Sequence, residues 1–277
     1  MWRVIRGRRR APGRLVAAIV LAGGSILLPT SAGSSEDTRS THALERSFTV
    51  AFYGDSLTRG SMGHVEERIA AERPGWRVIN RAFSGTAICD WFDQMRADAG
   101  LEPDLVVLQF SGNSFTECMA GVVVDSLALL AKYRTDAAWA AGFWTARGAD
   151  VVFVGNPRDV AEPALTVPHP LDDVYRTVVQ AATGPGVSFT DAPERALTVI
   201  DPADPTRAVF AREMPCRPSE IGMAACEDGQ ITVRSPDRRH FCPVVDPDRY
   251  PCSVYSAGSL RFGVALADAA IQHGRAG

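Results

Sequence analysis

The chain has 277 residues, of which 46% are hydrophobic and 22% are charged, and its formal net charge is −3. This length is sufficient for one well-buried domain of ordinary size. The acidic excess grows to a net charge of −9 if residues 1–32 are removed, and a chain with that charge is poorly suited to nonspecific binding of nucleic acid or of an anionic membrane surface.

The first 32 residues have the layout of a secretory signal peptide. Six arginines precede a short apolar run at 15–28, and Thr30-Ser31-Ala32 then places small residues before a cleavage site. An uncleaved anchor is the competing interpretation, but the apolar run is short for a membrane span, and no other stretch is long and apolar enough for one. Cleavage leaves 23 Lys and Arg against 32 Asp and Glu, a net charge of −9. We therefore expect a secreted or cell-envelope protein.

After a polar, flexible leader at 33–45, short apolar runs alternate with helical patterns through one domain at 46–277. We expect five strands, at 48–53, 76–79, 105–110, 151–154 and 187–189. Helices are expected between and after them, at 64–73, 90–99, 122–146, 171–183 and 256–273. This alternation predicts an α/β fold with a central parallel sheet covered on both sides.

Two later segments have distinct patterns. The segment at 191–236 is rich in Pro, Asp and Arg, and we expect a long surface insertion there rather than a second domain. In the last helix, apolar residues share one face, which we expect to be buried: Leu260, Val264, Ala267 and Ile271.

Six cysteines fit export into an oxidising compartment and allow 15 disulfide pairings. Cys216/Cys226 and Cys242/Cys252 share the same spacing, so we expect each pair to close a short loop. Elimination then leaves Cys89 with Cys118. A zinc site is the alternative interpretation, but no C-x₂-C pair occurs and no histidine flanks the cysteines at ligand spacing. We predict three disulfides.

A serine and a histidine carry the strongest chemical signal. Ser56 follows an apolar run directly, in Gly54-Asp55-Ser56-Leu57-Thr58-Arg59-Gly60, and Asp237 precedes His240 by three residues. A hydroxyl needs a positioned base to act as a nucleophile, and a carboxylate at this spacing can reach the histidine Nδ1. A helix cap or turn at Asp55-Ser56 is the plainer interpretation of that first motif.

Two further residues lie beyond the next strand candidates. Gly85 is in Phe83-Ser84-Gly85-Thr86, and Asn113 is in Ser111-Gly112-Asn113-Ser114. Each by itself is an ordinary turn residue. In the order Ser56, Gly85, Asn113, His240, however, the four blocks resemble those of the SGNH (GDSL-type) hydrolase family, over nearly the whole mature domain.

This resemblance implies a three-layer, flavodoxin-like α/β fold and a serine esterase. It assigns Ser56 as nucleophile, His240 as general base, Asp237 as its orienting acid, and the N–H groups of Ser56 and Gly85 with the Asn113 amide as the oxyanion hole. Two departures from the family pattern are Ser114, where Asp is usual, and two arginines between Asp237 and His240.

Other chemistries lack their motifs. The chain has no G-x-S-x-G, G-x-G-x-x-G, P-loop or H-E-x-x-H motif, so no metal or organic cofactor is expected. The prediction is a monomeric hydrolase of carboxylic esters, acting on a small-molecule, glycan or lipid ester. The alternatives are an acyltransferase of envelope glycans and an inactive glycan-binding module with the same fold.

Overall fold

A five-stranded parallel sheet forms the centre of the domain. The computed structural model describes residues 46–157, 169–184, 186–201, 203–243 and 255–274. The strand order is β2-β1-β3-β4-β5, and every pairing is parallel. All five predicted strands are present, each close to its expected position: β1 (Thr49–Gly54), β2 (Arg77–Ala82), β3 (Leu105–Gln109), β4 (Asp150–Val154) and β5 (Val187–Thr190).

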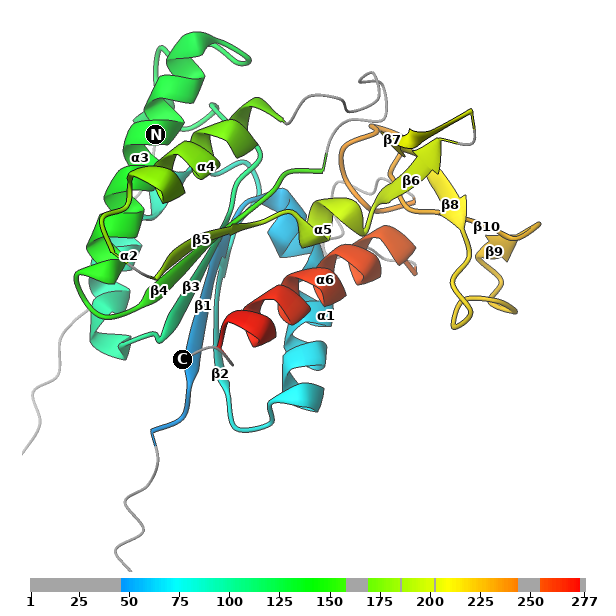
Figure 1. Ribbon diagram of the computed structural model, residues 1–277, viewed down its shortest axis with the longest axis horizontal. Helices are drawn as coiled ribbons and strands as arrows, with labels where there is room; N and C mark the ends of the chain where they lie inside the picture. Colours follow the sequence, from blue (N-terminus) through cyan, green and yellow to red (C-terminus); the bar gives the residue numbers. More distant parts are fainter. Residues whose placement is uncertain (1–45, 158–168, 185, 202, 244–254, 275–277) are drawn as a thin grey trace, which may run out of the picture. The chain divides into compact units, whose positions relative to one another are not determined.

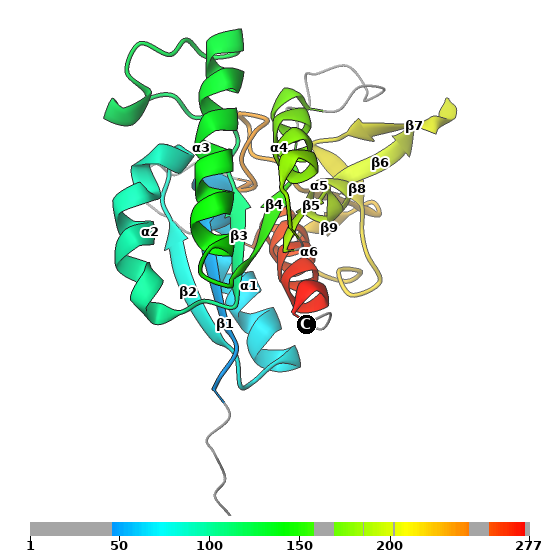
Figure 2. The ribbon, with the colours of Figure 1, turned by 60° about the vertical axis from the view of Figure 1, so that its left-hand side comes forward.

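Helices cover both faces of this sheet, so the predicted three-layer α/β architecture is confirmed (Figures 1 and 2). Helices α1 (Ser56–Glu72) and α6 (Ala257–His273) pack on one face, against alternate strand residues such as Val50 and Phe52. Helices α2 (Phe92–Asp98), α3 (Leu127–Thr145) and α4 (Pro170–Ala181) cover the other face. Strand side chains alternate between the faces, which is why β1, β3 and β4 each contribute to both cores.

Three helices begin elsewhere than predicted. Helix α1 begins at Ser56 rather than at residue 64, because Asp55 caps it by accepting a hydrogen bond from the Leu57 N–H. Helix α3 begins at Leu127 because Ser126 caps it. The expected helix at 90–99 is divided into the 3₁₀-helix η1 (Ile88–Trp91), α2, and the 3₁₀-helix η2 (Ala99–Leu101).

The last helix is present, and its predicted buried face is confirmed in part. Ala267 and Ile271 are buried as predicted, whereas Leu260 and Val264 are only partly so. Phe262, Leu266 and Ala270 are buried as well. The reason is the close approach of α1: a Cβ added at Gly263 would lie 2.7 Å from the Ser61 carbonyl oxygen. Small residues on this face let the two helices pack backbone against backbone, which an apolar-residue count does not reveal.

The segment at 191–236 is folded rather than a structureless loop. It contains the short helix α5 (Ala192–Arg195), the antiparallel pair β6 (Thr198–Asp201) and β7 (Asp204–Phe210), and a small antiparallel sheet of β8 (Glu213–Pro215), β10 (Gln230–Thr232) and β9 (Cys226–Glu227). Its Met214 and Ile231 join the core beneath α6. A buried ion pair from Arg261 to Glu220 ties it to that helix.

The 3₁₀-helix η3 (Glu117–Met119) completes the elements of the described part of the chain. None of the helices in those ranges combines the length and the apolar character that a membrane crossing needs.

Candidate active site

The candidate site lies at the carboxyl ends of the parallel strands, where sites of open α/β sheets form. Ser56 follows β1 and is the first residue of α1. Gly85 lies in the loop after β2, and Asn113 in the loop after β3. Because β1 pairs with both β2 and β3, these three positions are brought to one rim of the sheet.

His240 completes a contiguous chain of three polar side chains. Its Nε2 lies 2.9 Å from the Ser56 Oγ, although 184 residues separate the two in sequence. Its Nδ1 lies 2.6 Å from the Asp237 Oδ2. Both distances are those of hydrogen bonds. The structure therefore brings Ser56, His240 and Asp237 together in the order that proton transfer away from a serine hydroxyl requires.

A tight turn presents Asp237 and His240. The His240 carbonyl accepts a hydrogen bond from the Ser235 N–H, and Arg238 has a φ of 68°, a left-handed conformation that is strained for arginine. The Asp237 Oδ1 accepts hydrogen bonds from the Ser235 hydroxyl and from the backbone N–H groups of Arg239 and His240. Both carboxylate oxygens of Asp237 are therefore engaged in hydrogen bonds, which fixes the orientation of the side chain.

The ionised form of Asp237 is favoured. Partial burial raises the pKa of this carboxyl, but the hydrogen bonds from Ser235 and His240 outweigh it, and the net pKa lies below its ordinary value. Asp237 therefore carries a negative charge at neutral pH beside the imidazole. That charge favours the tautomer of His240 with its hydrogen on Nδ1, which leaves Nε2 to face Ser56 as the acceptor.

Asn113 is near the serine but is engaged in other contacts. Its Nδ2 donates to the Asp55 Oδ2 and to the Thr86 carbonyl, at 3.2 Å each. Gly85 has a φ of 79°, which a glycine adopts without strain, and it immediately precedes Thr86. The Asn113 amide thus links the loop after β3 to the loop after β2, beside the serine.

Asp55 organises this rim, a role that the sequence analysis did not assign. The side chain is fully buried and accepts from the Leu57 N–H, the Ser111 N–H and hydroxyl, and the Asn113 amide. Burial raises the pKa of Asp55, and the hydrogen bonds from Ser111 and Leu57 and the charge of His240 oppose that rise. Its place between a buried strand and Ser56 was the available sequence signal.

A buried polar chain also runs beneath the site. Thr58 donates to Gln109, Gln109 donates to Asn156, and Asn156 donates to Asp172. Burial raises the pKa of Asp172 to about 6, against hydrogen bonds from Asn156 and Glu194. The sequence analysis missed these residues, although Asn156 lies in the loop after β4 just as Asn113 lies in the loop after β3.

A cleft of about 680 Å³ opens at Ser56 and His240. Polar groups on its wall include Asn113, Asn156 and Arg239. A second, apolar group of lining residues comes from α3, α4 and the loop after β3: Phe115, Val124, Leu129, Leu130 and Leu171. A cleft with a small set of convergent polar groups and a large apolar wall is typical of a small-molecule site.

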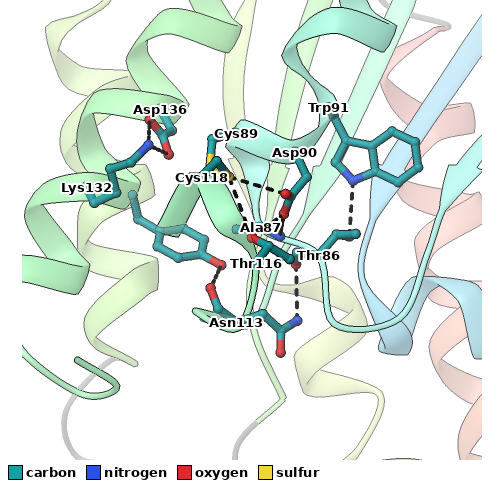
Figure 3. The surroundings of a disulfide bond; sticks show 11 residues. Thr86, Ala87, Cys89, Asp90, Trp91, Asn113, Thr116, Cys118, Lys132 and Asp136 are labelled. Atoms are coloured by element: carbon teal, nitrogen blue, oxygen red, sulfur yellow. Dashed lines mark hydrogen bonds and ion pairs between the residues drawn. A yellow bond between two sulfur atoms is a disulfide. The ribbon is translucent and has the colours of Figure 1, made fainter. Parts of the chain in front are cut away.

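Two of the three predicted disulfides lie within the described residues. Cys89 is bonded to Cys118, and Cys216 to Cys226, with Cα–Cα distances of 6.1 Å in both. The third predicted pair, Cys242–Cys252, includes a residue outside the described ranges. Among the described residues, the cluster with metal-ligating side chains is Cys89, Asp90 and Cys118, but its two sulfurs are bonded to each other and offer no thiolate (Figure 3).

Comparison with solved structures identifies the fold. A GDSL-like lipase from Bacteroides thetaiotaomicron aligns over 83% of this chain and 91% of its own, with a TM-score of 0.50 and 15% identity. The chain has the α/β fold of the SGNH hydrolases. An acetylxylan esterase from Geobacillus stearothermophilus covers 54% of this chain and 77% of its own (TM-score 0.42, 17% identity), and TesA covers 48% and 73% (0.37, 24%).

No protein-family model and no curated protein matches the sequence. The SGNH-type fold is supported by the strand order and by the alignment with the Bacteroides lipase.

Proposed function

We propose that the chain is an exported serine esterase that hydrolyses carboxylic esters through an acyl-enzyme. The observation that carries this proposal is the continuous contact of Ser56 with His240 and of His240 with Asp237, at 2.9 and 2.6 Å. A serine hydroxyl, a base in contact with it and an acid in contact with the base make up the machinery of acyl transfer.

In the proposed reaction, the Ser56 Oγ attacks the ester carbonyl carbon while the His240 Nε2 takes the hydroxyl proton. Asp237 stabilises the imidazolium that forms. The negative oxygen of the tetrahedral intermediate is held by the N–H groups of Ser56 and Gly85 and by the Asn113 amide. His240 then gives its proton to the departing alcohol, which leaves Ser56 acylated.

Water completes the cycle. It attacks the acyl carbonyl, His240 takes one of its protons, and collapse of the second tetrahedral intermediate returns that proton to the Ser56 Oγ and releases the carboxylic acid. For Asn113 to bind the oxyanion, its amide must exchange one of its two 3.2 Å contacts, to Asp55 or to Thr86, for the substrate oxygen. Both contacts are at the long end of the usual range, and the bond to the neutral Thr86 carbonyl is the weaker of the two, so it is the one that is exchanged at the lower cost.

The cleft supports a substrate with an acyl part and a polar part. Apolar side chains such as Leu129 and Leu171 line one wall and suit the acyl group, while Asn156 and Arg239 suit a polar alcohol such as a glycan or a lipid headgroup. The disulfides Cys89–Cys118 and Cys216–Cys226, together with the N-terminal signal pattern, support an extracytoplasmic location.

A fluorophosphonate probe tests the proposal, because it reacts covalently with an activated serine. We expect labelling of the wild-type protein at Ser56, no labelling of Ser56→Ala, and hydrolysis of p-nitrophenyl esters by the wild type only. Labelling at another serine, or undiminished hydrolysis by Ser56→Ala, would refute it. An inactive glycan-binding module would show neither reaction.

A further inference from the structure

The two loops that carry Gly85 and Asn113 come from strands that do not pair with each other. Gly85 follows β2 and Asn113 follows β3, and β1 lies between these strands. The hydrogen bonds of the sheet therefore hold each loop to β1 but do not set the distance between the loops. The distance between the two loops depends on direct contacts between them, beyond the carboxyl end of β1.

Figure 3 shows three of the contacts that join the two loops as one group. The Asn113 amide donates to the Thr86 carbonyl at 3.2 Å. The Thr116 hydroxyl donates to Asp90 at 2.9 Å, and the same Asp90 oxygen accepts from the Ala87 N–H at 2.7 Å. The third contact is the disulfide of Cys89 and Cys118, which is the covalent one.

We propose that the Cys89–Cys118 disulfide is a positioning device for the oxyanion hole: it holds Gly85 and Asn113 at the separation at which both can bind one oxygen. This inference rests on the proposed esterase function. Cys89 is four residues after Gly85, and Cys118 is five residues after Asn113. Because each donor is only a few residues from a cysteine of the disulfide, the covalent bond limits how far apart Gly85 and Asn113 can move.

The expected effect is on the chemical step rather than on substrate binding. Oxyanion donors act mainly in the transition state, and a displacement of about 1 Å reduces the rate about 10²-fold. Opening the disulfide leaves the hydrogen bonds from Asn113 to Thr86 and from Thr116 to Asp90, so the donors loosen without being lost. Three of the five apolar residues of the cleft wall lie on α3 and α4, outside the two loops that the disulfide joins: Leu129, Leu130 and Leu171.

The test compares two double variants, Cys89→Ser/Cys118→Ser and, as matched control, Cys216→Ser/Cys226→Ser. The control removes a disulfide from the segment at 191–236, of which the described residues do not line the cleft. For the first variant we expect kcat to fall roughly tenfold with KM nearly unchanged, and the affinity for a boronic acid, whose serine adduct carries an anionic tetrahedral centre, to weaken in the same proportion. The control should lose stability but keep its kcat.

A hydrogen-bond variant supplies a second measurement that does not depend on the cysteines. Thr116→Val should change kcat little in the disulfide-bonded protein and several-fold more when combined with Cys89→Ser/Cys118→Ser, because both contacts restrain the same pair of loops. If the cysteine variant fails to fold, limited reduction of the wild-type protein replaces it, with alkylation and peptide mapping to select molecules open only at Cys89–Cys118. Neither cysteine is buried, so reductant can reach the bond.

An unchanged kcat in the folded Cys89→Ser/Cys118→Ser variant, or an equal loss in the Cys216→Ser/Cys226→Ser control, would overturn the inference. A rise in KM at constant kcat would overturn it too, because it would place the disulfide in substrate binding. Failure of the proposed function gives a different result: the wild type itself would hydrolyse no ester and would not be labelled at Ser56.

Discussion

Replacing Asp55 by Asn should lower the activity of the domain much more than its stability. The carboxylate Oδ2 accepts from the Ser111 N–H and hydroxyl and from the Asn113 amide, while Oδ1 accepts from the Leu57 N–H. An amide must place an NH₂ group at one of these two positions. It is better placed at Oδ1, where it faces one donor, than at Oδ2, where it faces the groups of the loop after β3.

The stability loss should be small. Because burial raises the pKa of Asp55 despite its hydrogen bonds, ionisation of this carboxyl is less favourable in the folded protein than in the unfolded chain. A raised pKa gives stability that is present at acid pH and lost as the pH rises through the folded value. At neutral pH the neutral amide avoids that loss, and what remains is the lost α1 cap, about 1 kcal/mol.

The activity loss should be large. The amide binds Ser111 and Asn113 through neutral rather than charge-assisted hydrogen bonds, which are roughly half as strong. The Asn113 amide then moves more freely, and we expect kcat to fall at least about tenfold, since a displacement of about 1 Å reduces the rate about 10²-fold. Urea unfolding measures the first effect, and hydrolysis of a p-nitrophenyl ester measures the second.

Asp98→Asn is the matched control. Asp98 is also buried and accepts from Tyr53, Gln94 and Arg81, but it lies outside the cleft. Burial raises the pKa of Asp98, but the hydrogen bonds from Arg81 and Tyr53 lower it by more, so the net pKa is below its ordinary value. Ionised Asp98 therefore stabilises the fold at pH values above the pKa that it has in the unfolded chain. Asp98→Asn should lose more stability than Asp55→Asn, about 2 kcal/mol, and keep its kcat. Equal kcat losses in the two variants, or an unchanged kcat in Asp55→Asn, would refute this reasoning.

Three further predictions concern the site and the polar chain beneath it. Ser56→Ala and His240→Ala should each lower kcat by about 10³-fold or more without unfolding, and the double variant should be little worse than either, because the residues act as a unit; additive losses in steady-state assays would contradict this. Asn113→Ala should lower kcat about 10²–10³-fold with little change in KM; a raised KM at constant kcat would assign Asn113 to substrate binding instead. Because the pKa of Asp172 is raised to about 6, the wild type should lose stability as the pH rises through 6, whereas Asp172→Asn should not; parallel urea midpoints for both proteins at pH 5 and about pH 8 would disprove it.

The central architecture followed from local patterns. Short Val-rich runs such as those of β3 and β4, separated by helical stretches, are enough to predict a parallel sheet with two covered faces. The folded segment at 191–236 was not predictable in the same way, because its strands are only two to seven residues long and Met214 and Ile231 are stabilised by distant contacts with the α6 side of the core.

The site residues, like the fold, were only partly predictable from the sequence. The sequence alone determined the residues whose meaning is local: a serine directly after an apolar strand, and a carboxylate three residues before a histidine. Only the tertiary structure decided that His240 contacts Ser56 across 184 residues, that Asp55 accepts four hydrogen bonds, and that Thr58, Gln109, Asn156 and Asp172 form one chain. The physical reason is the sequence separation of the interacting residues. Strand and helix patterns depend on neighbours within a few positions, whereas hydrogen bonds between buried side chains depend on which strand ends the fold brings to the same rim.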